Sequence, residues 1–135
     1  MSIMKWKDTY SVGVEEIDNQ HKGLVSTLNE LFDAMSVGQA NDILGNIINK
    51  MIRYAVIHFE TEEKYFDEFD YALSDEHKDE HDRFKDEVQH FKVGFDAGNI
   101  VLSMEVFKFL KDWLINHMMV EDQKYKQCFQ ENGLK

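Results

Sequence analysis

The chain has 135 residues, a formal net charge of −11 and one cysteine, Cys128. Its length suits one domain, and 43% hydrophobic residues can fill a single core without disulfide bonds. The acidic balance excludes a surface for nucleic acid or anionic membranes, because both require a basic face. No apolar run reaches the ~18 residues of a membrane span, and no signal-peptide pattern opens the chain. We therefore expect one domain over residues 1–135, cytoplasmic and monomeric.

The first 17 residues carry aromatic and apolar side chains without helical periodicity. Trp6, Tyr10, Val12 and Val14 lie at spacings that no single helix face would bring together. Residues 1–17 are therefore predicted to form an irregular N-terminal arm that packs through its aromatic side chains. The chain contains no proline, so long unkinked helices are permitted and glycine marks their ends.

Two amphipathic helices are predicted after the arm. The first begins near Asp18, a favourable N-cap residue, and ends before Gly38. The second begins at Asn41 or Asp42 and extends through residue 66. Apolar residues recur along both segments at steps of three and four, which is the period of a helix with one buried face.

Two further helices complete the pattern. The third opens at Ser74 or Asp75 and runs to about Gly94 or Gly98, and the fourth covers about 103–133. Strand signals are nearly absent. Four amphipathic helices joined by short links predict an all-α, up-down-up-down four-helix bundle over residues 18–133.

Five of the six histidines and two carboxylates fall on the expected inward faces of these helices. They are His21, His58, Glu62, His77, His81, His117 and Asp122. Residues four apart lie about 40° apart around a helix, and each histidine continues an apolar stripe, as His81 does with Phe84 and Val88. Buried imidazoles and carboxylates are costly unless paired, whereas metal ions use both as ligands. One ion rarely takes more than about six ligands, so this set predicts two metal ions.

Two positions test this interpretation. His90 lies nine residues after His81, about 180° round the helix, and is expected to face solvent. Asp122 lies five residues after His117, about 140° away on a regular helix, so Glu121 fits regular geometry better. Asp122 can converge with the histidines only if the helix widens locally, as in a π-bulge, and spacing alone favours Glu121.

The order of these residues resembles the hemerythrin family in its bacterial form. The matching motifs are His21 in DNQHK, His58-x3-Glu62, His77-x3-His81 and His117-x4-Asp122, together with Trp6 and the stretch VEEIDNQHK. The resemblance spans essentially the whole chain and favours Asp122 over Glu121. It implies two iron ions joined by an oxo or hydroxo bridge and by the carboxylates Glu62 and Asp122. It also implies that one iron is held by His77, His81 and His117, and the other by His21 and His58.

The resemblance implies reversible dioxygen binding for oxygen transport, storage or delivery, and not an enzyme. An oxygen-consuming protein would be the expected recipient. The alternatives are a di-iron oxidase or peroxide-handling enzyme, an oxygen or redox sensor module, and a zinc site, which the ligand count disfavours because tetrahedral zinc takes about four ligands. The apolar stripes supply the expected wall of the oxygen pocket. Its residues are Leu24, Leu28, Phe66, Trp113 and Leu114.

Overall fold

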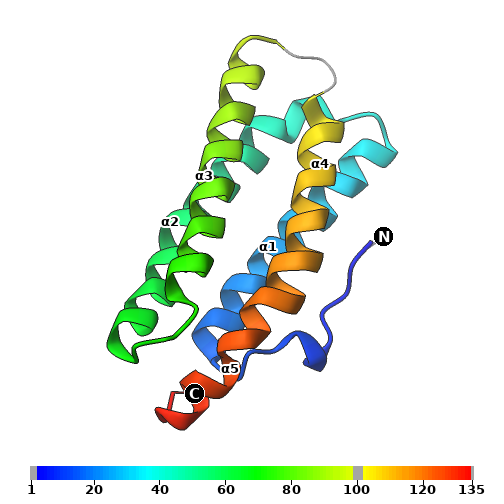
Figure 1. Cartoon of the computed structure of the whole chain (residues 1–135). Helices are drawn as coiled ribbons and strands as arrows, with labels where there is room; N and C mark the ends of the chain where they lie inside the picture. The colour runs from blue at the N-terminus through cyan, green and yellow to red at the C-terminus, as the bar shows by residue number, and fades with distance from the viewer. Residues whose placement is uncertain (1–2, 99–101, 135) are drawn as a thin grey trace.

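The computed structural model describes residues 3–98 and 102–134, and within them four helical segments pack side by side (Figure 1). Successive segments run in opposite directions, and no strand occurs in the described residues. The long helices are α1 (Glu15–Ser36), α2 (Ala40–Glu68), α3 (Ser74–Asp96) and α4 (Leu102–Trp113). This arrangement confirms the predicted all-α, up-down-up-down four-helix bundle.

The fourth segment continues beyond α4 in three irregular steps. A π-helix, η2 (Leu114–Glu121), is followed by the 3-10 helix η3 (Asp122–Tyr125) and the short helix α5 (Lys126–Glu131). A π-helix has a wider turn than an α-helix, so the residues that follow it are rotated relative to a regular continuation. The fourth segment is therefore helical almost to the predicted end, but its register changes within it.

Helix α1 begins at Glu15, so the predicted N-cap role of Asp18 is wrong. Val14 occupies the N-cap position and makes no side-chain capping hydrogen bond. The carboxylate of Asp18 instead accepts hydrogen bonds from the Ser11 hydroxyl (2.5 Å) and the Val12 amide (2.9 Å). The side chain of Asp18, which the local sequence predicted as a helix cap, therefore makes a tertiary contact with the arm instead.

Residues 15–17 were predicted as part of the N-terminal arm but form the first turn of α1. The rest of the arm is irregular and packs through its aromatic residues, as predicted. It contains one 3-10 turn, η1 (Asp8–Tyr10), and the ring of Trp6 lies edge-on to Tyr10 with ring centres 5.7 Å apart. The side-chain amide of Gln123 donates to the carbonyl of Tyr10 (3.0 Å), which ties the arm to η3. The first two residues of the predicted arm lie outside the described residues.

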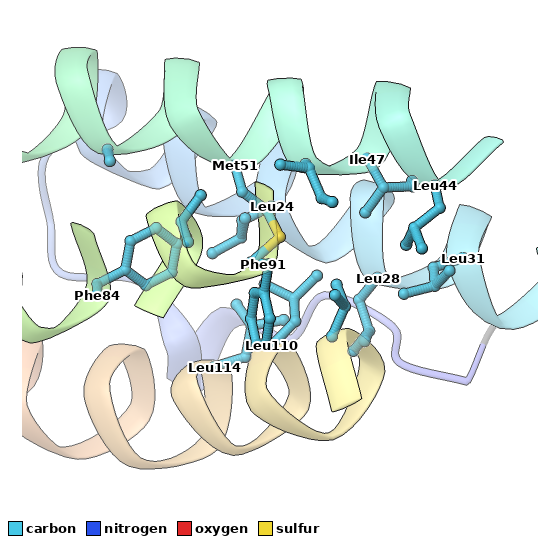
Figure 2. Packing of buried hydrophobic residues seen from close by; sticks show 14 of the residues in the cluster. Leu24, Leu28, Leu31, Leu44, Ile47, Met51, Phe84, Phe91, Leu110 and Leu114 are labelled. Carbon is cyan, nitrogen blue, oxygen red and sulfur yellow. The ribbon is translucent and has the colours of Figure 1, made fainter. Parts of the chain in front are cut away.

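Two groups of buried apolar side chains fill the bundle. The main cluster occupies the middle of the bundle and the end at which α1 meets α2 (Figure 2). Its labelled members are Leu24, Leu28, Leu31, Leu44, Ile47, Met51, Phe84, Phe91, Leu110 and Leu114. The closing cluster fills the opposite end with residues from the arm, α1, α2, the link between α2 and α3, and the C-terminal segment. Its members are Val12, Val14, Ile17, Phe66, Tyr71, Tyr125 and Phe129.

The outward faces of the helices are largely polar. His90 is exposed on α3, which confirms the prediction made from its spacing to His81. Among the described helices, none combines the length and apolar character needed to cross a membrane. The other five histidines are buried inside the bundle, between the two clusters.

Candidate metal centre

Seven potential metal ligands meet in the bundle interior, and all are buried. They come from α1 (His21), α2 (His58 and Glu62), α3 (His77 and His81), η2 (His117) and η3 (Asp122). The ring of Phe59 stacks on His81 with centres 3.8 Å apart, and Phe66 of the closing cluster lies 4.9 Å from His77. Aromatic side chains thus enclose the polar centre on both sides.

The π-helix η2 explains how Asp122 reaches this centre. Asp122 is fully buried, and its Oδ1 lies 3.0 Å from His117 Nε2. Glu121 keeps 28% of its side chain exposed and pairs with Lys124. The widened turn that the five-residue spacing required is present, and the neighbour that regular periodicity favoured turns outward.

The ligand atoms form two groups that share Glu62. The three-histidine group consists of Glu62, His77, His81 and His117, and the two-histidine group of His21, His58, Glu62 and Asp122. In each group, two imidazole Nε2 atoms lie only 3.1 Å apart: His21 and His58 in one, His77 and His117 in the other. Facing imidazole nitrogens at that distance need a proton or a metal cation between their lone pairs. The donor set therefore fits two cations.

Glu62 faces histidines of both groups. Its Oε1 lies 3.1 Å from His58 Nε2 and 3.0 Å from His81 Nε2. Despite these short distances, neither oxygen of Glu62 accepts a hydrogen bond of good geometry within the described residues. Leaving a buried carboxylate without directed donors is costly, so this side chain is better suited to bridge two cations than to accept hydrogen bonds.

Asp122 occupies the equivalent position on the other side. Its Oδ2 lies 2.7 Å from His21 Nε2, while its Oδ1 lies 2.8 Å from His77 Nε2. Both oxygens are also without a well-formed hydrogen bond in the described part of the chain. Each oxygen of Asp122 thus points to a different group, which is the arrangement expected of a bridging carboxylate.

The site holds protons strongly when no cation is present. Burial lowers the pKa of His58, but the charges of Glu62 and Asp122 outweigh it and raise this pKa to about 9. The same carboxylates raise the pKa of His77 to about 10 against the effect of burial. For His21, burial and the charge of His58 lower the pKa. Burial would also raise the pKa of both carboxyls, yet the histidines hold it well below the usual range.

The outer nitrogens of three histidines have polar partners that the sequence analysis did not identify. The pairs, with the oxygen-to-Nδ1 distance, are Gln20 and His58 (2.6 Å), Glu63 and His81 (2.9 Å), and Glu80 and His117 (3.3 Å). Each partner oxygen accepts from Nδ1–H, so Nε2 is left to face the centre. Each partner directly precedes or follows a predicted ligand in the sequence, which is the one signal that could have indicated it.

Four of the five predicted pocket residues lie on the main-cluster side of the histidines. They are Leu24, Leu28, Trp113 and Leu114. Trp113 stacks on His117 with ring centres 3.9 Å apart. Phe66 lies on the other side, in the closing cluster. Tyr54, which was not predicted, stacks on His58 at 4.7 Å and buries its hydroxyl.

An open groove of about 400 Å³ runs between α1 and α2 and ends at the two-histidine group. Tyr54, His58 and Leu24 lie along it, and so does Gly23 in the interior of α1. A side chain at Gly23 would meet no atom within 4 Å, so close packing does not require glycine there. A side chain at this position would occupy part of the groove that the glycine leaves open.

Comparisons with known proteins point to one family. The family model for the hemerythrin HHE cation binding domain matches residues 12–129. A bacteriohemerythrin of Pseudomonas aeruginosa is 34% identical over 93% of this chain and 80% of its own length. One from Methylococcus capsulatus is 31% identical over 95% of this chain and 98% of its own. A crystal structure of a hemerythrin mutant superposes with a TM-score of 0.84 at 29% identity, covering 95% of this chain and 98% of that one.

Proposed function

The chain belongs to the hemerythrin family, and from that premise we propose that it binds dioxygen reversibly at a non-haem di-iron centre. Its role would be oxygen transport, storage or delivery, carried out by a single domain made of the arm and the bundle. One observation carries the proposal. The buried ligands divide unequally into a three-histidine and a two-histidine group around two shared carboxylates.

Each part of the ligand set has a role in this proposal. The histidines of each group would hold one iron through Nε2, and Glu62 and Asp122 would bridge the pair together with an oxo or hydroxo group. When bound, the iron pair would supply the reversible two-electron chemistry that dioxygen binding requires. Because the two-histidine group offers one imidazole fewer, it is the side at which an external ligand can bind.

The surroundings of the two-histidine group favour reversible binding over oxidation chemistry. Leu24 and Leu114 are almost fully buried, and the ring of Tyr54 covers His58. Apolar walls limit the entry of water and protons, and both promote irreversible oxidation of a reduced metal site. The groove beside Gly23 is wide enough for a small gas molecule to approach. These features support a binding protein over an enzyme.

The test is stoichiometric oxygen uptake. Metal-free protein is loaded anaerobically with two ferrous ions, exposed to oxygen and followed by visible absorption and an oxygen electrode. We expect one dioxygen per iron pair and an absorption band that disappears under argon. Zinc-loaded protein should show neither. Continued consumption of oxygen or added peroxide would instead indicate an enzyme, and the absence of uptake would refute the proposal.

A further inference from the structure

The three-histidine group is backed by carboxylates on its outer side. The Nδ1 of His81 lies 2.9 Å from Glu63, and the Nδ1 of His117 lies 3.3 Å from Glu80. Both glutamates are partly shielded, with 29% and 26% of the side chain exposed. Two of these three imidazoles therefore meet a carboxylate through Nδ1.

In the part of the chain that the structure describes, no carboxylate meets the outer nitrogens of the two-histidine group. The Nδ1 of His58 meets the neutral amide oxygen of Gln20 at 2.6 Å. The Nδ1 of His21 is buried and has no hydrogen-bond partner within the described residues. The two groups thus differ in the charge behind the histidines as well as in their number.

The orientation of the Gln20 amide is fixed by a chain of hydrogen bonds. The hydroxyl of Thr61 donates to the carbonyl of Ile57 (2.8 Å), so its oxygen is free to accept from Gln20 Nε2 (3.2 Å). The amide oxygen of Gln20 is therefore directed at His58 and accepts from its Nδ1–H. This contact orients the ring of His58 without placing a negative charge behind it.

A carboxylate that accepts from an imidazole N–H makes the opposite nitrogen a stronger donor, and a neutral amide does so less. We propose that Glu63, Glu80 and Gln20 are positioning residues that make the two metal positions unequal in affinity. This inference rests on the ligand set of the proposed function. The carboxylate-backed three-histidine position binds metal first and more tightly. The two-histidine position, backed by Gln20, binds metal more weakly and exchanges it faster.

The central test replaces the amide with a carboxylate of the same shape, Gln20→Glu. Metal-free protein is titrated with Co²⁺, whose visible bands report each site as it fills. The wild-type protein should show two binding steps. The variant should bind the second ion about 10–100-fold more tightly, because hydrogen-bond partners of ligand histidines change metal affinity by that factor, and its first step should be unchanged. Asn19→Asp is the matched control, because it adds the same charge on an exposed neighbouring position and should leave both steps unchanged.

The reverse substitution, from carboxylate to amide, gives an independent test. Glu63→Gln should weaken the first step by about 10–100-fold, whereas Glu60→Gln, on an exposed position of α2, should not. In the iron-loaded protein, Gln20→Glu should also lower the reduction potential. Equal affinities at both positions in wild type, or unchanged titrations in both Gln20→Glu and Glu63→Gln, would overturn the inference. Graded metal binding without reversible oxygen uptake would refute the proposed function while leaving this inference intact.

Discussion

The bundle has two halves that use the same four helical segments but are stabilised differently. The main cluster fills one half, and the other holds the seven ligand candidates. Leu28, Ile47 and Leu110 are completely buried and apolar, so their burial favours folding without any further partner. The other half buries Glu62 and Asp122 against histidines at short distances but without well-formed hydrogen bonds. The first half therefore specifies the fold, and the second gathers side chains that are able to hold cations.

The largest expected effect is a loss of metal binding that is confined to the ligand half. His77→Ala or His81→Ala removes one of three imidazoles that point at the same position, so binding of the metal pair should be abolished. Iron content after loading and a Co²⁺ titration measure this directly. His90→Ala, on the exposed face of α3, should still bind two ions. A His81→Ala protein that keeps two irons and normal oxygen uptake would show that the ligand set is incorrect.

The next effect concerns the apolar half. Leu110→Ala leaves a cavity among fully buried side chains and should lower the free energy of unfolding by about 2–5 kcal/mol. Urea unfolding followed by circular dichroism measures the change. The loss should be the same with and without metal, because Leu110 makes its contribution through packing. A loss that appears only in the loaded protein would mean that the two halves are not independent.

Removing both metal ions should have an effect of comparable size. Ions that bind only the folded chain stabilise it by about 2.7 kcal/mol per site at a free concentration 100-fold above Kd. Thermal unfolding should therefore occur at a lower temperature after chelation, while the helical circular dichroism at room temperature stays high because the main cluster persists. Loss of helical signal on chelation would contradict the view that the apolar half specifies the fold.

The last prediction is a pH dependence of metal affinity that is confined to the ligand half. The pKa values of about 9 for His58 and about 10 for His77 mean that both carry protons at pH 7 in the metal-free protein. Metal must displace these protons, so affinity should rise by about tenfold per pH unit for each proton released, and level off above those pKa values. Zinc affinity in a chelator buffer between pH 6 and 8 tests the slope. The Leu110→Ala penalty should not change over this range.

The sequence predicted most of this molecule because most of it is regular helix. The apolar stripes gave four helices, and the pairs four residues apart on α2 and α3 were correctly expected to face inward, since regular helices keep their period. Asp122 was different, because the period alone favoured Glu121 and only the family pattern selected the aspartate. The N-cap prediction for Asp18 failed for a related reason: the arm folds back and binds that carboxylate.

The hydrogen-bond partners behind the histidines could not be predicted in the same way. Glu80 on α3 meets His117 on η2, and Gln20 on α1 meets His58 on α2. Such pairs depend on how two helices are rotated against each other, and no spacing within one helix reveals that rotation. Sequence periodicity determines which residues face the interior, while the identity of a partner across the interface requires coordinates.

The π-helix η2 couples two parts of the protein that would otherwise be separate. An α-helix advances about 100° per residue, so the wide turn shifts the facing of every later residue as well as Asp122. Tyr125 and Phe129 consequently point into the closing cluster, where a regular continuation would have turned the half-buried Cys128 inward. Deleting a single residue from this turn would rotate Asp122 away from the other ligand candidates. It would also rotate Tyr125 and Phe129 out of the closing cluster. The position of Asp122 among the ligand candidates and the packing of the closing cluster therefore depend on the same turn.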